Sequence, residues 1–78
     1  MKGTIIKLIR KIKGDWESKI NEHTDLYNDL MFDELDSIEL LMDSEVKFNI
    51  SISDLEWDKC NNVKDVIALI DKTINSSK

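Results

Sequence analysis

Isoleucine and leucine side chains recur at steps of three and four near the start of the chain. They stand at positions 5, 8, 9 and 12, and most of the residues between them are lysine or arginine. This spacing places the apolar side chains on one face of a helix, so an amphipathic helix is predicted over residues 4–13. Gly14 with Asp15 is expected to end it, because glycine readily adopts the left-handed backbone that closes many helices.

A second periodic segment follows an irregular stretch, residues 15–32. The face of this second helix that is expected to meet the core carries Leu35, Ile38, Leu41, Met42 and Val46, with Leu40 and Phe48 beside it. The opposite positions are acidic. Asp33 is predicted to cap the start of the helix, with Asp36 three residues on in the reciprocal capping position. Asn49 is expected to end it.

The rest of the chain predicts one extended segment and two more helices. Residues 49–53 alternate like a strand, but no partner strand exists for them, so they are interpreted as an extended linker. A short helix is expected over 53–57, and a final helix from residue 63 to about residue 74. The predicted fold class is therefore all-α: a small four-helix bundle of three main helices and one short helix, with residues 1–78 as a single domain.

The net charge and the distribution of charged residues limit the kinds of partner that the chain is expected to bind. The chain has 78 residues, a formal net charge of −5 and 35% charged residues, which does not suit a nucleic-acid partner. Basic residues gather at the start: five lie within residues 1–13, where no acid occurs. Six acids lie between residues 33 and 45 with no lysine or arginine among them: Asp33, Glu34, Asp36, Glu39, Asp43 and Glu45. Such a stretch attracts basic partner surfaces, although a solvent-exposed helix face is the simpler interpretation.

The chain has one cysteine and one histidine, which argues against a disulfide-stabilised protein and against a metal-binding protein. Cys60 alone cannot form a disulfide framework, which favours a reducing, cytoplasmic location. One histidine, His23, and one cysteine do not support a metal site. No apolar run is long enough to cross a membrane, and the charges within residues 1–13 interrupt any signal-peptide core, so this segment is interpreted as part of the mature protein. Trp57 is expected to lie in the core.

Several motifs then combine into a resemblance. The segments "NDL" at 28–30, "LDSIELLM" at 35–42 and "VKDVIALI" at 63–70, together with Phe48, Ile52 and Asp54, resemble the acyl carrier protein family. The resemblance implies a four-helix bundle that is a carrier and not an enzyme. In that family, a serine in an Asp-Ser-Leu motif at the start of the second helix receives 4′-phosphopantetheine. The thiol of this arm holds acyl or aminoacyl groups as thioesters.

The resemblance also implies partners. These are a phosphopantetheinyl transferase and acyl- or aminoacyl-transferring enzymes with basic docking surfaces, which would meet the acidic second helix of a monomeric carrier. Fatty-acid, polyketide and cell-envelope pathways all use such carriers. The acidic residues 33–45 are the candidate partner-binding surface.

Two alignments of the attachment site remain open. Aligned without gaps, the family's serine position falls on Glu34, which lies four residues after Leu30 and 14 before Phe48. Aligned by local motif, "DSI" at 36–38 makes Ser37 the attachment site, with Asp36 as the helix cap. Ser18 and Ser44 are poorer candidates. The first alignment suggests a different function: a carrier-like interaction module that lacks the arm and binds or regulates an enzyme through its acidic helix.

Overall fold

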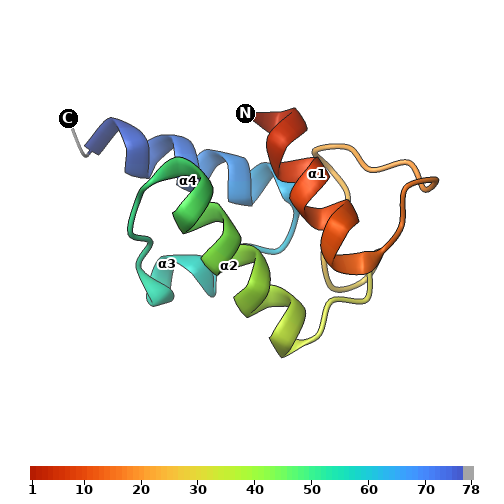
Figure 1. Ribbon diagram of the computed structural model, residues 1–78. Coiled ribbons are helices and arrows are strands. Elements are labelled where there is room, and N and C mark those ends of the chain that lie inside the picture. Colours follow the sequence, from red (N-terminus) through yellow and green to blue (C-terminus); the bar gives the residue numbers. More distant parts are fainter. Residues whose placement is uncertain (77–78) are drawn as a thin grey trace.

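Helices form the framework of the computed structural model, which describes residues 1–76 (Figure 1). In chain order they are α1 (Lys2–Lys13), α2 (Glu34–Phe48), α3 (Asp54–Trp57) and α4 (Val63–Ser76). α1 packs against both α2 and α4, and α3 packs against α4. Within residues 1–76 no strand is present apart from one isolated bridge. The predicted all-α class and small four-helix bundle are confirmed.

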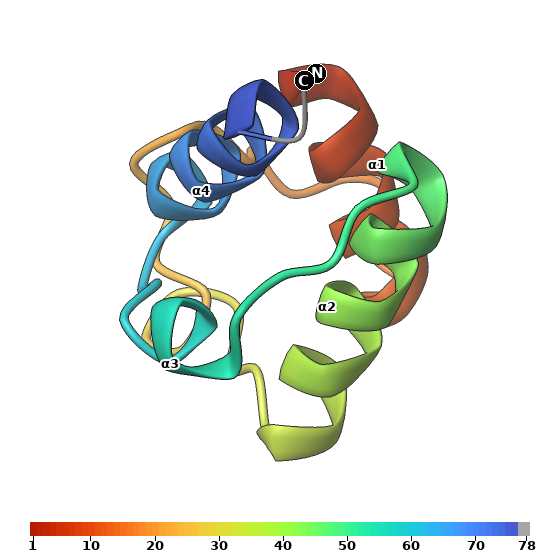
Figure 2. The ribbon, with the colours of Figure 1, turned by 90° about the vertical axis from the view of Figure 1, so that its left-hand side faces the viewer.

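One core lies between the helices. Its largest fully buried apolar side chains come from α1, α2, α4 and the loop after α1: Ile5, Ile9, Leu26, Leu40, Val63, Val66 and Ile70. Figure 2 shows the segment between α2 and α3 crossing from one side of the bundle to the other. This segment is extended, as predicted, and it buries Ile52, whose backbone N–H donates to Glu45 Oε2 at 2.8 Å.

α1 ends where its sequence predicts. Gly14 adopts φ 65°, and its N–H donates to the Arg10 carbonyl, which closes the last turn. Residues 15–32 form no helix in the structure. Backbone hydrogen bonds from Leu26 N–H to the Asn61 carbonyl, 2.9 Å, and from Val63 N–H to the Thr24 carbonyl, 3.1 Å, tie this loop to the start of α4. The loop is therefore an ordered part of the bundle that sets where α2 begins.

α2 turns a different face to the core from the one predicted. Leu35, Ile38, Met42 and Val46 are exposed, and the exposed fraction of Val46 reaches 83%. Of the predicted face only Leu41 turns inward, and it is joined there by Leu40 and Phe48, which were predicted beside that face, and by Ser37 and Ser44. Apolar residues stand on two sides of this helix, so periodicity alone does not choose between them. The predicted inward face was wrong because two serines occupy the true one.

Ser44 is a polar residue fully enclosed by the core. Its Oγ is the only buried side-chain polar atom within residues 1–76 that has no hydrogen-bond partner. An unsatisfied buried hydroxyl costs about 1–3 kcal/mol. We therefore expect Ser44→Ala to raise the free energy of unfolding by about 1 kcal/mol in urea denaturation. The exposed Ser51→Ala is the control and should change little; a Ser44→Ala chain less stable than the parent would contradict the assignment.

None of the helices in residues 1–76 is both long and apolar enough to cross a membrane. α3 begins at Asp54, one residue inside the predicted range 53–57, and the Ser53 side chain that precedes it makes no capping hydrogen bond. α4 extends two residues beyond the predicted end, to Ser76. These elements bring Trp57, the last residue of α3, to within hydrogen-bond distance of α2, and the candidate site forms at that contact.

Candidate attachment site at the start of α2

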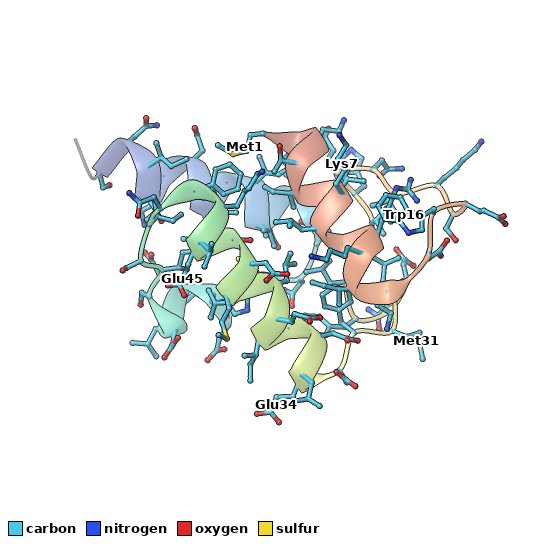
Figure 3. All side chains as sticks on the ribbon, viewed as in Figure 1. Met1, Lys7, Trp16, Met31, Glu34 and Glu45 are labelled. Atoms are coloured by element: carbon cyan, nitrogen blue, oxygen red, sulfur yellow. The ribbon has the colours of Figure 1, made fainter. Side chains whose placement is uncertain are left out.

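Asp33 and Asp36 fix the first residue of α2. The Asp33 carboxylate accepts from the Asp36 N–H at 2.8 Å, and the Asp36 carboxylate accepts from the Asp33 N–H at 3.3 Å, which completes the predicted capping box. Glu34 is therefore the first helical residue, and it lies exposed at the tip of α2 (Figure 3). The alternative in which Asp36 caps the helix and Ser37 begins it was wrong.

A positive backbone dihedral at Met31 supports the ungapped alignment. In the acyl carrier protein family that the sequence resembles, an Asp-Leu-Gly turn precedes the attachment serine, and Met31 stands after Leu30 in the position of that glycine. Met31 adopts φ 56°. A left-handed conformation disfavours residues with a Cβ and suits glycine, so the backbone at Met31 is one that glycine would favour.

Met31→Gly tests this turn. The side chain is 73% exposed, so its removal costs little packing. Relief of the left-handed strain should raise the free energy of unfolding by about 1 kcal/mol. Met31→Ala is the matched control, because it removes the same side chain but keeps the Cβ. Equal stabilities of the two variants in urea would show that the turn stores no such strain.

Ser37 lies one turn inside α2 and faces inward. Its N–H donates to the Asp33 carbonyl at 3.0 Å. Its Oγ accepts a hydrogen bond from Trp57 Nε1 at 3.0 Å and shares a second hydrogen bond with the Tyr27 hydroxyl at 3.2 Å. Trp57 is buried, as predicted. The hydroxyl thus joins α2 to α3 and to the loop before α2, although Ser37 itself is only half-buried.

The Ser37 hydroxyl lies at an open cavity of about 540 Å³ between α2, α3 and the Tyr27 loop. Its lining combines apolar and acidic side chains: Tyr27, Glu34, Ser37, Ile38, Leu41, Asp54, Trp57 and Asp58. No lysine or arginine is among these lining residues. The positions that the two alignments assign to the attachment site, Glu34 and Ser37, therefore line the same cavity.

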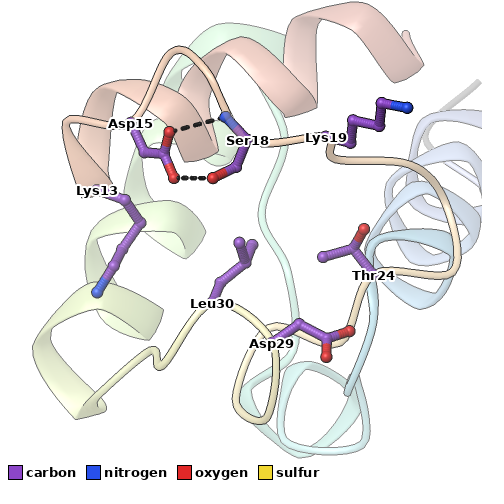
Figure 4. Close-up of a pocket in the computed structure, with 7 residues that line it drawn as sticks. All are labelled: Lys13, Asp15, Ser18, Lys19, Thr24, Asp29 and Leu30. Carbon is purple, nitrogen blue, oxygen red and sulfur yellow. Dashed lines mark hydrogen bonds between the residues drawn. The ribbon is translucent and has the colours of Figure 1, made fainter.

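The other two candidate serines are placed differently. Ser44 is fully buried, so its hydroxyl is out of reach of any enzyme. Ser18 lies in the loop, where its Oγ donates to one Asp15 carboxylate oxygen and its N–H donates to the other (Figure 4). These hydrogen bonds lower the pKa of Asp15. Ser18 belongs to a second cavity, of about 270 Å³, which does not include α2.

The six acids of residues 33–45 do not form one free surface. Asp36 pairs with Lys13 of α1, Oδ2 to Nζ 2.9 Å, and this hydrogen bond lowers the pKa of the Asp36 carboxyl. Glu45 accepts the Ile52 N–H. The exposed acids are Asp33, Glu34 and Glu39, while Asp43 is half-buried. Beside them lies the exposed apolar stripe of Leu35, Ile38, Met42 and Val46.

His23 and Cys60 lie apart from the site. The His23 side chain is exposed in the loop, next to Glu22. Cys60 is buried, and burial raises the pKa of its thiol to about 11, so it stays protonated at neutral pH. Within residues 1–76 no cluster of three potential metal ligands occurs.

Sequence reasoning missed two residues of the site. The sequence did not predict that Tyr27 and Trp57 hydrogen-bond to Ser37. They lie 10 and 20 residues from Ser37 along the chain, so no local sequence pattern indicates these contacts. A tryptophan at the end of the short helix was the only available signal, and it indicated a core residue rather than a hydrogen-bond donor.

Comparison with known proteins identifies the family to which the chain is similar. Residues 4–70 match a family model described as the phosphopantetheine attachment site. The chain is 34% identical to the acyl carrier protein of Thermotoga maritima over 67 residues, which cover 86% of this chain and 83% of the relative. It is 36% identical to that of Chloroherpeton thalassium over 70 residues, which cover 90% and 88%.

Solved structures share the fold. A Mycobacterium tuberculosis protein described as a candidate acyl carrier protein superposes with a TM-score of 0.86 at 27% identity, covering 91% of this chain and 95% of that one. The holo acyl carrier protein of Geobacter metallireducens gives a TM-score of 0.82 at 22% identity, covering 97% and 87%.

The helical bundle and the capped start of α2 define a carrier domain of the phosphopantetheine-attachment class. The chain belongs to the acyl carrier protein family. Members of this family are carriers and not enzymes, and the family's prosthetic group is 4′-phosphopantetheine on a serine. The predictions of a carrier and of this cofactor are thus confirmed at the level of the family.

The side chains at the site fit this group at one position. Its linkage is a phosphodiester to a hydroxyl, which Glu34 does not have. Ser37 does have one, half-buried at the wall of an open cavity. Ser37 is accordingly the α2 residue whose chemistry and accessibility both suit the group.

Proposed function

We propose that this protein carries acyl or aminoacyl groups as thioesters on a 4′-phosphopantetheine arm joined to Ser37, and presents them to partner enzymes. The observation that carries the proposal is the position of the Ser37 hydroxyl at the open cavity between α2 and α3. When bound, the arm supplies a thiol on a flexible tether, which raises the effective concentration of its cargo at each partner's active site.

Attachment at Ser37 would transfer the phosphopantetheinyl group from coenzyme A to the serine hydroxyl. The Ser37 Oγ forms a bond to the phosphorus next to the pantetheine of coenzyme A, and the pyrophosphate bond breaks. Adenosine 3′,5′-bisphosphate leaves, and the serine proton passes to a base of the transferase.

The proposed partners are a phosphopantetheinyl transferase and acyl- or aminoacyl-transferring enzymes with basic surfaces. The exposed acids at the start of α2 support this choice, because opposite charges speed and orient encounter. We further propose that residues 1–78 act as one monomeric carrier domain in the cytoplasm. Fatty-acid, polyketide or cell-envelope synthesis would supply its cargo.

Incubation with a phosphopantetheinyl transferase and coenzyme A, followed by intact mass measurement, tests the proposal. The expected result is a gain equal to one phosphopantetheinyl group, with the modified peptide containing Ser37. A chain that gains nothing from either a broad-specificity transferase or the one from its own cells would contradict the proposal.

A second candidate function is a carrier-like module without the arm, which binds or regulates an enzyme through α2. The specific observation in its favour is Glu34, which occupies the first position of α2 directly after the Asp33 cap. The family's serine stands at that position in the ungapped alignment. Binding of a partner by the unmodified chain through residues 33–45 is what this function requires.

A further inference from the structure

The Ser37 hydroxyl links α2 to α3 at the cavity, because it hydrogen-bonds both Trp57 of α3 and Tyr27 of the preceding loop. Trp57 Nε1–H can only donate, and it points at the Ser37 Oγ from 3.0 Å. The Tyr27 hydroxyl lies 3.2 Å from the same oxygen. Trp57 is 5% exposed and Tyr27 38% exposed, so the indole donor is fixed by packing while the phenol stands at the rim.

Part of the donor set that a helix start normally offers an anion is already engaged at the start of α2. The N–H groups of Asp36 and Ser37 already donate to the side chain and the carbonyl of Asp33. These two N–H groups are therefore not free to bind phosphate. An arm one turn inside the helix needs other donors.

The charges around the cavity increase the need for hydrogen-bond donors to the phosphodiester. Glu34, Asp54 and Asp58 line it, and no basic side chain is among its lining residues. Three carboxylates disfavour a further negative charge unless hydrogen-bond donors offset them. The uncharged groups within hydrogen-bond distance of the attachment oxygen are Trp57 Nε1–H, which donates to it, and the Tyr27 hydroxyl, which shares a hydrogen bond with it in which either oxygen can donate.

We propose that Trp57 Nε1–H and the Tyr27 hydroxyl hold the phosphodiester of an arm attached to Ser37. This inference rests on the proposed function. Once esterified, the Ser37 Oγ has lost its proton and is a weak acceptor, whereas the ionised phosphate oxygens one bond further on are strong acceptors. Trp57 and Tyr27 then donate to phosphate from nearly their present positions. They are positioning residues, which add to the backbone donors that the helix start leaves available.

The two tryptophans of the chain provide the test. Uniform ¹⁵N labelling gives two indole N–H signals, and Trp16→Phe, at a side chain 63% exposed, assigns the remaining one to Trp57. The Ser37→Ala chain gives the position of the Trp57 signal without its acceptor. No variant alters Trp57 itself, so its packing is preserved. The spectra are recorded before and after conversion by a transferase and coenzyme A.

On conversion, the Trp57 indole proton should move downfield, away from the Ser37→Ala position. Its exchange with solvent should slow about fivefold, as expected when a neutral acceptor is replaced by a charged one. The Trp16 signal should stay in place and serves as the internal control. Conversion of a Tyr27→Phe chain should give a smaller slowing, because one of the two donors is missing.

The outcomes separate this inference from the proposed function. A chain that gains no mass overturns the function, and the inference with it. A chain that gains the arm on Ser37 while the Trp57 signal moves toward the Ser37→Ala position, or exchanges faster, overturns the inference alone. In that case the arm displaces the indole and the carrier function stands.

Discussion

Replacement of Ser37 by alanine is expected to abolish attachment of the arm completely. The linkage needs a hydroxyl, and no other α2 serine is accessible, because Ser44 is fully buried. Intact mass after incubation with a transferase and coenzyme A should show a gain for the parent chain and none for the variant. Loss of the Trp57 hydrogen bond should cost only about 1 kcal/mol, so the variant is expected to stay folded.

Ser51→Ala is the matched control for this experiment. Ser51 is exposed in the extended segment between α2 and α3, and its replacement should leave the mass gain unchanged. Helix content from circular dichroism shows that each variant is folded. A Ser37→Ala chain that still gains the arm would place the attachment site elsewhere and contradict the assignment.

The second large effect is expected in the core. Leu40 of α2 is fully buried, and Leu40→Ala should lower the free energy of unfolding by about 2–5 kcal/mol. A domain of this size has a total stability of roughly 5–10 kcal/mol, so the variant should be close to unfolded at room temperature. Urea unfolding followed by circular dichroism measures the difference.

Leu35→Ala removes the same atoms from the opposite side of the same helix. Its side chain is 76% exposed, so a change of about 0.5 kcal/mol or less is expected. The pair thus tests the orientation of α2 directly. A Leu35→Ala chain as unstable as Leu40→Ala would support the face that the hydrophobic pattern predicts and contradict the structure.

Local signals in the sequence were sufficient for the end of α1 and for both ends of α2, whereas α1 begins two residues before, and α4 ends two residues after, the predicted positions. Gly14, Asp33 and Asn49 act through backbone groups within a few residues of themselves, and each ends or begins a helix where predicted. The orientation of α2 is not determined by local sequence signals. It depends on which side α1 and the loop before α2 occupy, and Lys13 draws Asp36 toward α1. A helix with apolar residues on both sides carries no pattern that decides this.

The candidate site was likewise predictable only in part. Glu34 and Ser37 were both named from sequence, because spacing and local motif each point to a position. Which of them begins the helix follows from the Asp33–Asp36 capping box, and this choice is a structural result. The hydrogen bonds of Ser37 to Tyr27 and Trp57 depend on how three segments pack, and sequence alone does not contain that information.

The proposed attachment point lies one turn later in α2 than Glu34. Met31 adopts a left-handed conformation and Asp33 caps the helix, so α2 begins at Glu34. Ser37 lines the same cavity as Glu34, so an arm attached to Ser37 would leave the bundle on the same face as one attached at position 34. The proposed carrier function would then need no change in fold.

The intact mass of the protein purified from its own cells tests the central claim most directly, because it asks whether the arm is present where the protein works. We predict a chain heavier by one phosphopantetheinyl group, with or without cargo, and fragmentation that places the added mass on Ser37. A native chain that is wholly unmodified would contradict the account and favour the interaction module without an arm.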